Sequence, residues 1–189
     1  MITLVYGGTS SGKSAYAEDL VCSSKYQYRF YLATMSANDE ESKSRIQRHR
    51  KLREGKGFIT LEHARDIRNS IGDIERICTG NFSTEDLNAN GRIVLLECMS
   101  NLVANEMFCD GEIYDAGHCI EKIIDEIKEL ESQVSELVIV TNNVFEDGIT
   151  YDTETEDYLK ALGTINSKLA KEAAKLVEVS VGIPIVLKE

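Results

Sequence analysis

The chain has 189 residues, of which 42% are hydrophobic and 28% charged, a composition within the ordinary range of soluble proteins. This length is enough to bury a large core, and we expect one domain over residues 1–189. The formal net charge of -11 argues against a nucleic-acid backbone as the main partner, because the chain as a whole does not offset phosphate repulsion.

Three further features bear on location. No apolar run approaches the roughly 20 residues that span a bilayer. The first residues lack the charged and apolar regions of a secretion signal. The five cysteines are odd in number and form no C-x-x-C pair, which favours free thiols in a reducing compartment over disulfides or a zinc site. We therefore expect a cytoplasmic protein.

Short apolar runs alternate with helical patterns along the chain. The runs cover residues 2–6, 29–34, 92–97, 136–141, 177–181 and 185–187. Such runs are typical of strands covered on both faces of a parallel sheet. Apolar residues recur at helical spacing over 120–130 and from Tyr158 to Leu176, and the polar segment 80–91 is expected to be a surface loop or short helix. The pattern predicts an α/β fold, with a mostly parallel central sheet and helices on both faces.

The first run leads directly into the segment G-G-T-S-S-G-K-S. Gly7, Gly12, Lys13 and Ser14 fit G-x-x-x-x-G-K-[ST], the P-loop. The glycines let backbone N–H groups point at phosphate oxygens, and the helix that starts near Lys13 adds its positive N-terminal end. Lys13 is expected to reach the β- and γ-phosphates and the Ser14 hydroxyl to ligate Mg²⁺. A P-loop NTPase-like fold that binds a nucleoside triphosphate is favoured over a turn that merely joins strand to helix.

Candidate site residues follow other strands. Y-L-A-T brings Ala33, Thr34 and Met35 to the carboxyl edge of the sheet, where ligands of open α/β sheets bind, although a strand running into a loop is an equal alternative. Glu97 ends another strand, and an acidic residue there commonly handles Mg²⁺ in P-loop proteins; the alternative is a carboxylate facing solvent. The residues after the fourth run could face the same crevice: Thr141, Asn142 and Asn143.

The segment from Asp39 to Arg50 is predicted to be helical and contains His49. It belongs to the dense basic patch of the sequence, which comprises Arg45, Arg48, His49, Arg50, Lys51, Arg53 and Lys56. Cationic neighbours disfavour protonation of His49 and leave its imidazole available as a nucleophile, and the same arginines could hold phosphate oxygens. The residues alone leave open a solvated basic helix face with an incidental histidine. The other histidines, His63 and His118, are expected to be surface or packing residues.

Together these motifs resemble the bifunctional adenosylcobinamide kinase / adenosylcobinamide-phosphate guanylyltransferase family of cobalamin synthesis. The matching blocks keep the family's order over essentially the whole chain: G-G-T-S-S-G-K-S, Y-L-A-T, the D-x-E-x-x-x-R-I-x-x-H run that ends at His49, L-L-E-C at 95–98, V-T-N at 140–142 and G-I-P at 182–184. The R-I-x-x-H run beside Y-x-A-T is far more specific than the P-loop.

The resemblance implies two reactions and a set of residues. ATP or GTP would phosphorylate adenosylcobinamide; GTP would guanylylate His49, which would pass GMP to adenosylcobinamide phosphate and give adenosylcobinamide-GDP. His49 and Lys13 are implied as catalytic, and Ser14 and Glu97 as ligands of Mg²⁺. The implied nucleotide contacts are Gly7, Gly8, Thr9, Ser10, Ser11, Gly12, Lys13, Ser14, Ala33, Thr34, Met35, Arg50, Lys51, Leu52, Arg53, Glu62 and Glu97. Glu62 enters by the resemblance alone, and the homotrimers known in the family imply a trimer here.

The chain departs from the family pattern at Asn143, Phe145 and Leu159, on loops expected to contact substrate and phosphate. Two other functions are consistent with the residues. One is a P-loop kinase of another small molecule, in which His49 is structural. The other is a nucleotide-binding regulatory module that transfers nothing.

Overall fold

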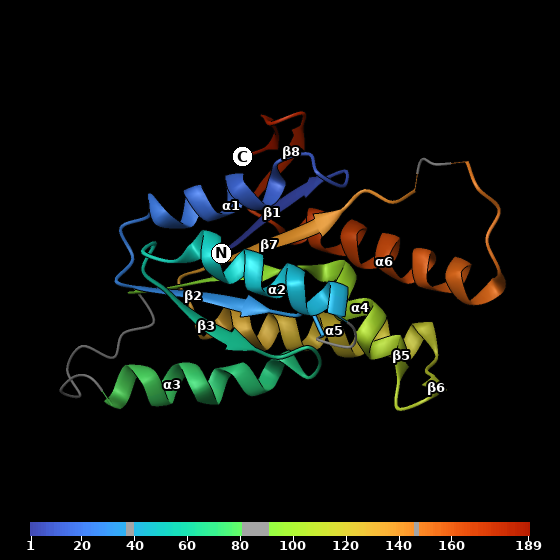
Figure 1. The fold of residues 1–189 in the computed structure, drawn as a ribbon, viewed down its shortest axis with the longest axis horizontal. Helices are drawn as coiled ribbons and strands as arrows, with labels where there is room; N and C mark the ends of the chain where they lie inside the picture. The colour runs from blue at the N-terminus through green and yellow to red at the C-terminus, as the bar shows by residue number, and fades with distance from the viewer. Residues whose placement is uncertain (37–39, 81–90, 146–147) are drawn as a thin grey trace.

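The structure, a computed structural model, describes residues 1–36, 40–80, 91–145 and 148–189 (Figure 1). Its centre is a seven-stranded sheet of order β3-β2-β4-β7-β1-β8-β9. The parallel strands are β1 (Ile2–Gly7), β2 (Tyr28–Ala33), β3 (Phe58–Glu62), β4 (Arg92–Glu97), β7 (Glu136–Asn142) and β8 (Lys175–Ser180). β9 (Ile183–Lys188) pairs antiparallel with β8. The predicted α/β fold with a mostly parallel sheet is confirmed.

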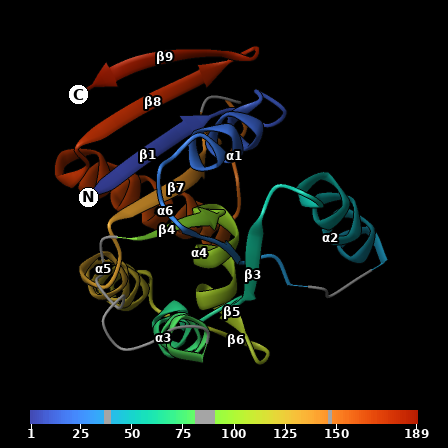
Figure 2. The same ribbon diagram turned by 90° about the vertical axis from the view of Figure 1, so that its left-hand side faces the viewer.

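Helices cover both faces of this sheet (Figure 2). On one face α1 (Lys13–Cys22) packs Ala17 and Val21 against strand residues such as Val5. The other face is covered by α3 (Ser70–Gly80), α4 (Met99–Met107), α5 (Ala116–Ser132) and α6 (Thr153–Glu172). Neighbouring residues of a strand point to opposite faces of the sheet. Val5 belongs to the core beneath α1, and Leu4 belongs to the core beneath α3, α4, α5 and α6. Because both faces are buried, the strands have continuous apolar sequences.

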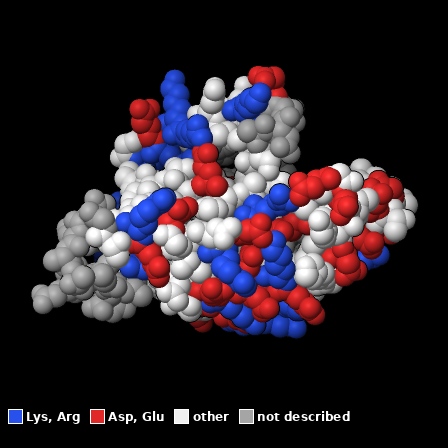
Figure 3. Space-filling view, turned by 90° about the horizontal axis from the view of Figure 1, so that it is seen from below, with Lys and Arg blue, Asp and Glu red and all other residues white. Residues whose placement is uncertain are grey.

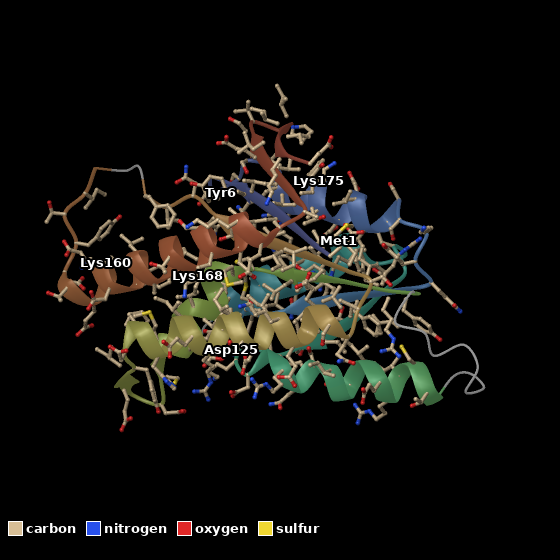
Figure 4. All side chains as sticks on the ribbon, turned by 180° about the vertical axis from the view of Figure 1, so that it is seen from behind. Met1, Tyr6, Asp125, Lys160, Lys168 and Lys175 are labelled. Carbon is tan, nitrogen blue, oxygen red and sulfur yellow. The ribbon has the colours of Figure 1, made fainter. Side chains whose placement is uncertain are left out.

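The outer side of the four-helix layer is charged. Figure 4 shows this layer from behind, and Asp125 of α5 and Lys160 and Lys168 of α6 are exposed there. On the face seen from below, acidic and basic side chains are intermingled (Figure 3). That face carries no broad basic surface in its described part.

Helix α2 (Glu40–Arg53) lies between β2 and β3 in the chain and on the α1 side of the sheet (Figure 2). Among its described side chains, only that of Arg53 is buried. The remaining small elements are a 3-10 turn (Ile67–Asn69) before α3 and a hairpin, β5 (Phe108–Cys109) and β6 (Glu112–Ile113), after α4. None of the helices in the described part of the chain combines the length and apolar character that crossing a membrane requires.

Two details differ from the sequence predictions. β3 was not predicted, because its five residues are mostly half-exposed and lack an apolar run. The helical pattern through Leu176 was wrong at its end: α6 stops at Glu172, and Leu176 lies in β8 opposite Leu4 of β1. The apolar residues of β8 follow closely after the end of α6, and part of β8 is buried in the sheet. The loop predicted over 80–91 falls largely on 81–90, outside the described residues.

A buried hydroxyl ties the ends of β2 and β4 together. Thr34 Oγ1 donates to the Cys98 carbonyl and accepts from the Cys98 N–H, both at 2.8 Å, and the side chain is fully buried. Thr34→Val keeps the shape but leaves that N–H unpaired, so we expect a loss of about 2 kcal/mol of unfolding free energy and a fall of about 6 °C in Tm. Calorimetry measures this, with Thr34→Ser as the control that retains the hydroxyl. An unchanged Tm for Thr34→Val would contradict the assignment.

Candidate active site

A cleft of about 330 Å³ opens at the carboxyl ends of the strands next to the P-loop. It brings together residues from six separate parts of the sequence. They are Thr9, Ser10, Lys13 and Ser14 of the P-loop; Tyr31, Ala33 and Met35 of β2 and the loop after it; Ile46, Arg48, His49, Arg50 and Arg53 of α2; Glu62 of β3; Glu97, Cys98 and Asn101 from the end of β4 into α4; and Asn142 of β7. The segments that the sequence predicted separately therefore share one cleft.

The P-loop backbone is shaped to receive an anion. Gly12 caps α1 with a φ of 93° and, having no side chain, leaves the first N–H groups of the helix without a side-chain cap. Those donors, with the positive end of the helix dipole, are the usual binding groups for phosphate. Lys13 is buried and its Nζ donates to the Gly8 carbonyl at 3.1 Å, which holds the ammonium beside the loop.

The turn between β8 and β9 forms a backbone hydrogen bond with the P-loop. The Gly182 N–H donates to the Ser11 carbonyl at 2.8 Å. A Cβ on Gly7 would lie 2.5 Å from the Val179 carbonyl oxygen, so only glycine fits where β1 passes into the loop. The G-I-P block at 182–184 thus has a structural explanation, because its first residue, Gly182, contacts the P-loop.

Ser14 and Glu97 form the acidic corner of the cleft. Ser14 Oγ donates to Glu97 Oε1 at 2.8 Å, while Glu97 Oε2 is buried with no hydrogen-bond partner in the described structure. Burial raises the pKa of the Glu97 carboxyl from 4.5 to about 7, although Ser14 and the Lys13 ammonium lower it in part. A carboxylate oxygen and a hydroxyl beside a phosphate site are hard ligands of the kind that Mg²⁺ takes. The described residues contain no group of three or more His, Cys, Asp or Glu that could hold a metal.

Helix α2 forms the opposite wall and presents His49 to the cleft. One turn further on, the Arg53 guanidinium lies 3.5 Å from the centre of the Tyr31 ring. Its Nε and Nη1 are buried and have no hydrogen-bond partner in the described structure. Arg50 forms an ion pair with Glu62 at the end of β3. A cation with unused donors beside a phosphate loop is suited to hold phosphate oxygens.

Some of the predicted nucleotide contacts are not among the residues that line the cleft. Thr34 does not line the cleft, since its hydroxyl is used by Cys98. Gly7, Gly8, Ser11 and Gly12 contribute to the P-loop backbone and are not among the lining residues. Lys51 lies outside the cleft, and the side chain of Leu52 is outside the described structure.

The other two histidines have structural positions, as predicted. His63 Nε2 lies 2.9 Å from an Asp73 carboxylate oxygen. His118 is exposed in the first turn of α5, where its N–H donates to Asp115. Neither residue lines the cleft.

Four lining residues were missed from the sequence: Tyr31, Ile46, Cys98 and Asn101. Strand and helix periodicity contained the signal for two of them. Tyr31 precedes Ala33 by two positions and so shares its face of β2, and Ile46 precedes His49 by about one helical turn. Asn101 follows Cys98 in the first turn of α4, at the carboxyl edge. Burial raises the pKa of the Cys98 thiol, which keeps it protonated and unreactive.

Comparison with known proteins identifies the family. The model of the family described as cobinamide kinase / cobinamide phosphate guanyltransferase matches residues 3–187. The chain belongs to this family. Three relatives named bifunctional adenosylcobalamin biosynthesis proteins match over 100% of the chain. CobU of Escherichia coli is 30% identical with 100% of its length covered, CobU of Salmonella typhimurium 28% with 100%, and CobP of Pseudomonas aeruginosa 26% with 98%.

Among solved structures, the flagellar accessory protein FlaH of Methanocaldococcus jannaschii aligns with 99% of the chain and 77% of its own. The TM-score is 0.45 and the sequence identity 14%, a likeness too distant to support a conclusion.

Membership of the cobinamide kinase / cobinamide phosphate guanyltransferase family makes the protein a bifunctional enzyme, as the motifs predicted. A kinase and a guanyltransferase each take a nucleoside triphosphate. The P-loop, Lys13 and the acidic corner suit a group of that kind.

The raised pKa of Glu97 gives a pH-dependent stability. Because the folded state favours the protonated carboxyl, the wild type loses stability as pH rises from about 4.5 to about 7, by on the order of 2 kcal/mol. Glu97→Gln keeps the acceptor for Ser14 but cannot ionise, so it should gain stability over the wild type at about pH 8 and show little gain near pH 4.5. Urea unfolding at both pH values measures this. A gain that is the same at both would show that Glu97 is not the titrating group.

Proposed function

We propose that the protein phosphorylates adenosylcobinamide with ATP or GTP and transfers GMP from GTP to adenosylcobinamide phosphate through a guanylyl-histidine at His49. The observation that carries this proposal is that His49 of α2 lines the same cleft as Lys13 and Ser14 of the P-loop. A nucleophile and a phosphate cradle in one cleft suit covalent transfer, which a nucleotide-binding module without catalysis does not need.

In guanylyl transfer, an imidazole nitrogen of His49 attacks the α-phosphorus of GTP. An N–P bond forms as the bond to the bridging oxygen breaks, and pyrophosphate leaves with the electron pair. An oxygen of the cobinamide phosphate then attacks the same phosphorus and returns the imidazole. Lys13 and the donors of Arg53 are placed to offset charge on the phosphates, which is the main contribution a protein makes to such transfers.

In phosphoryl transfer, the aminopropanol hydroxyl of adenosylcobinamide attacks the γ-phosphorus and a nucleoside diphosphate leaves. The P-loop N–H groups and Lys13 hold the nucleotide in both reactions. Ser14 and Glu97 would hold Mg²⁺, which when bound supplies charge neutralisation to the phosphates. The buried, unpartnered Oε2 of Glu97 supports this assignment.

The acceptor would approach from the side of β7 and α6, where the chain departs from the family pattern. Asn142 lines the cleft, and the Asn143 N–H is used by the Gly7 carbonyl at 2.9 Å. Phe145 is exposed, and Leu159 is half-buried on α6. Since the three departures lie outside the P-loop itself, we expect them to affect the choice of corrinoid more than nucleotide binding.

Labelling with GTP that carries a radioactive α-phosphate tests the proposal. We expect an acid-labile, alkali-stable protein label that His49→Ala abolishes, because a phosphoramidate has that stability. His118→Ala, a change at an exposed histidine on α5, is the matched control and should label normally. His49→Ala should retain phosphorylation of adenosylcobinamide. Absence of label in the wild type, with kinase activity present, would favour a simple P-loop kinase, and absence of both products would favour a regulatory module.

We also propose a homotrimer, as the family resemblance implies. β9 is an edge strand whose apolar side chains are exposed: Ile183, Ile185, Val186 and Leu187. Exposed apolar edges are usually covered by another chain, which supports contact between copies here. Light scattering should give about three times the chain mass of 21.1 kDa, and a mass equal to one chain would contradict the proposal.

A further inference from the structure

None of the described side chains of the helix that carries His49 packs into an apolar core. α1 and α5 bury side chains such as Val21 and Ile123 in the two cores, whereas the described side chains of α2 contribute none to either core. The one buried side chain among them, Arg53, is a cation. Polar contacts near the C-terminal end of α2, which lies on the α1 side of the sheet (Figure 2), therefore contribute to holding the helix in place.

One of these contacts joins the turn after α2 to the P-loop helix. Lys56 Nζ lies 2.6 Å from Glu18 Oε2, and the Glu18 side chain is only 7% exposed. The Lys56 N–H donates to the Arg53 carbonyl at 3.0 Å, so the lysine is fixed to the last turn of α2. Glu18 follows Ser14 by one turn of α1. The ion pair thus links the His49 helix to the helix that begins at the phosphate cradle.

The Glu18–Lys56 contact differs from the other ion pair of α2. Arg50 and Glu62 are both more than half exposed, so water and salt weaken their attraction. Glu18 is buried, and a buried carboxylate without its partner is costly, which makes this contact hard to break. The hydrogen bond that Lys56 donates to the Glu18 carboxylate raises the pKa of Lys56, so the lysine is charged near neutral pH.

We propose that Glu18 and Lys56 are positioning residues for guanylyl transfer, holding α2 where His49 reaches the α-phosphate. The inference rests on the proposed role of His49. The pair acts on one reaction more than the other, because His49 is a reactant in guanylyl transfer and not in phosphoryl transfer. A nucleophile displaced by about 1 Å can lose on the order of a hundredfold in rate, whereas a nucleotide held by the P-loop keeps its affinity.

The test compares Lys56→Met with a matched control. Lys122→Met breaks ion pairs that join other elements: Lys122 Nζ of α5 lies 2.6 Å from Glu106 Oε2 of α4, whose side chain is 5% exposed, and 2.7 Å from Asp66 Oδ1. We expect Lys56→Met to slow labelling of His49 by about tenfold or more, with adenosylcobinamide phosphorylation and the Kd for GTP changed by less than about twofold. Lys122→Met should change the two reactions by the same factor. Equal losses in both reactions for Lys56→Met, or none, would overturn the proposal.

Two further measurements separate this idea from its premise. Lys56→Arg retains the charge and should restore most of the labelling rate. Hydrogen exchange of the α2 amides needs no chemistry: Lys56→Met should speed it, and Lys122→Met should not. If the wild type is never labelled, the proposed function fails, and the exchange experiment still decides whether the ion pair holds α2. Unchanged exchange in Lys56→Met would overturn the positioning role.

Discussion

Parallel pairing of β1 between β7 and β8 is the constraint on which the site depends. It places Gly7 opposite Asn142, so the P-loop leaves the sheet beside the end of β7. β4 pairs with β2 on one side and with β7 on the other, which places Glu97 opposite Ala33. Only β7 separates β4 from β1, the strand that leads into the P-loop. Since parallel strands bring all their carboxyl ends to one edge, the cradle, the carboxylate and the end of β2 meet although crossover connections separate them in the sequence.

Two kinds of interaction hold the walls of the cleft. The sheet wall is fixed by apolar burial on both faces and by the Thr34 hydroxyl, which joins β2 to the start of α4. The α2 wall is fixed by charged groups that cross to Tyr31, Glu62 and α1. Apolar packing is stiff and hardly responds to salt, whereas ion pairs respond to both salt and pH. Apolar packing therefore holds the P-loop in place, whereas charged contacts hold the helix that carries His49.

The sequence was sufficient for the sheet and for most of the cleft. Buried strands have continuous apolar sequences, and a P-loop must follow one, so β1, β4 and the positions of Lys13 and Glu97 could be predicted. β3 could not, because an edge strand that is half-exposed has no distinctive pattern. The role of Thr34 was also hidden, since its partner is backbone from a segment far along the chain. A contact between segments so far apart depends on the tertiary fold, and it produces no recognisable pattern in the local sequence.

The contact between Gly182 and Ser11 has a consequence for how the protein is made. The P-loop is synthesised well before the backbone that contacts it, which belongs to β8 and the turn after it. β1 lacks one of its two neighbours until β8 has been synthesised. Pairings so distant in sequence form late and slowly. During synthesis, the cradle would therefore exist as a sequence well before it exists as a binding site.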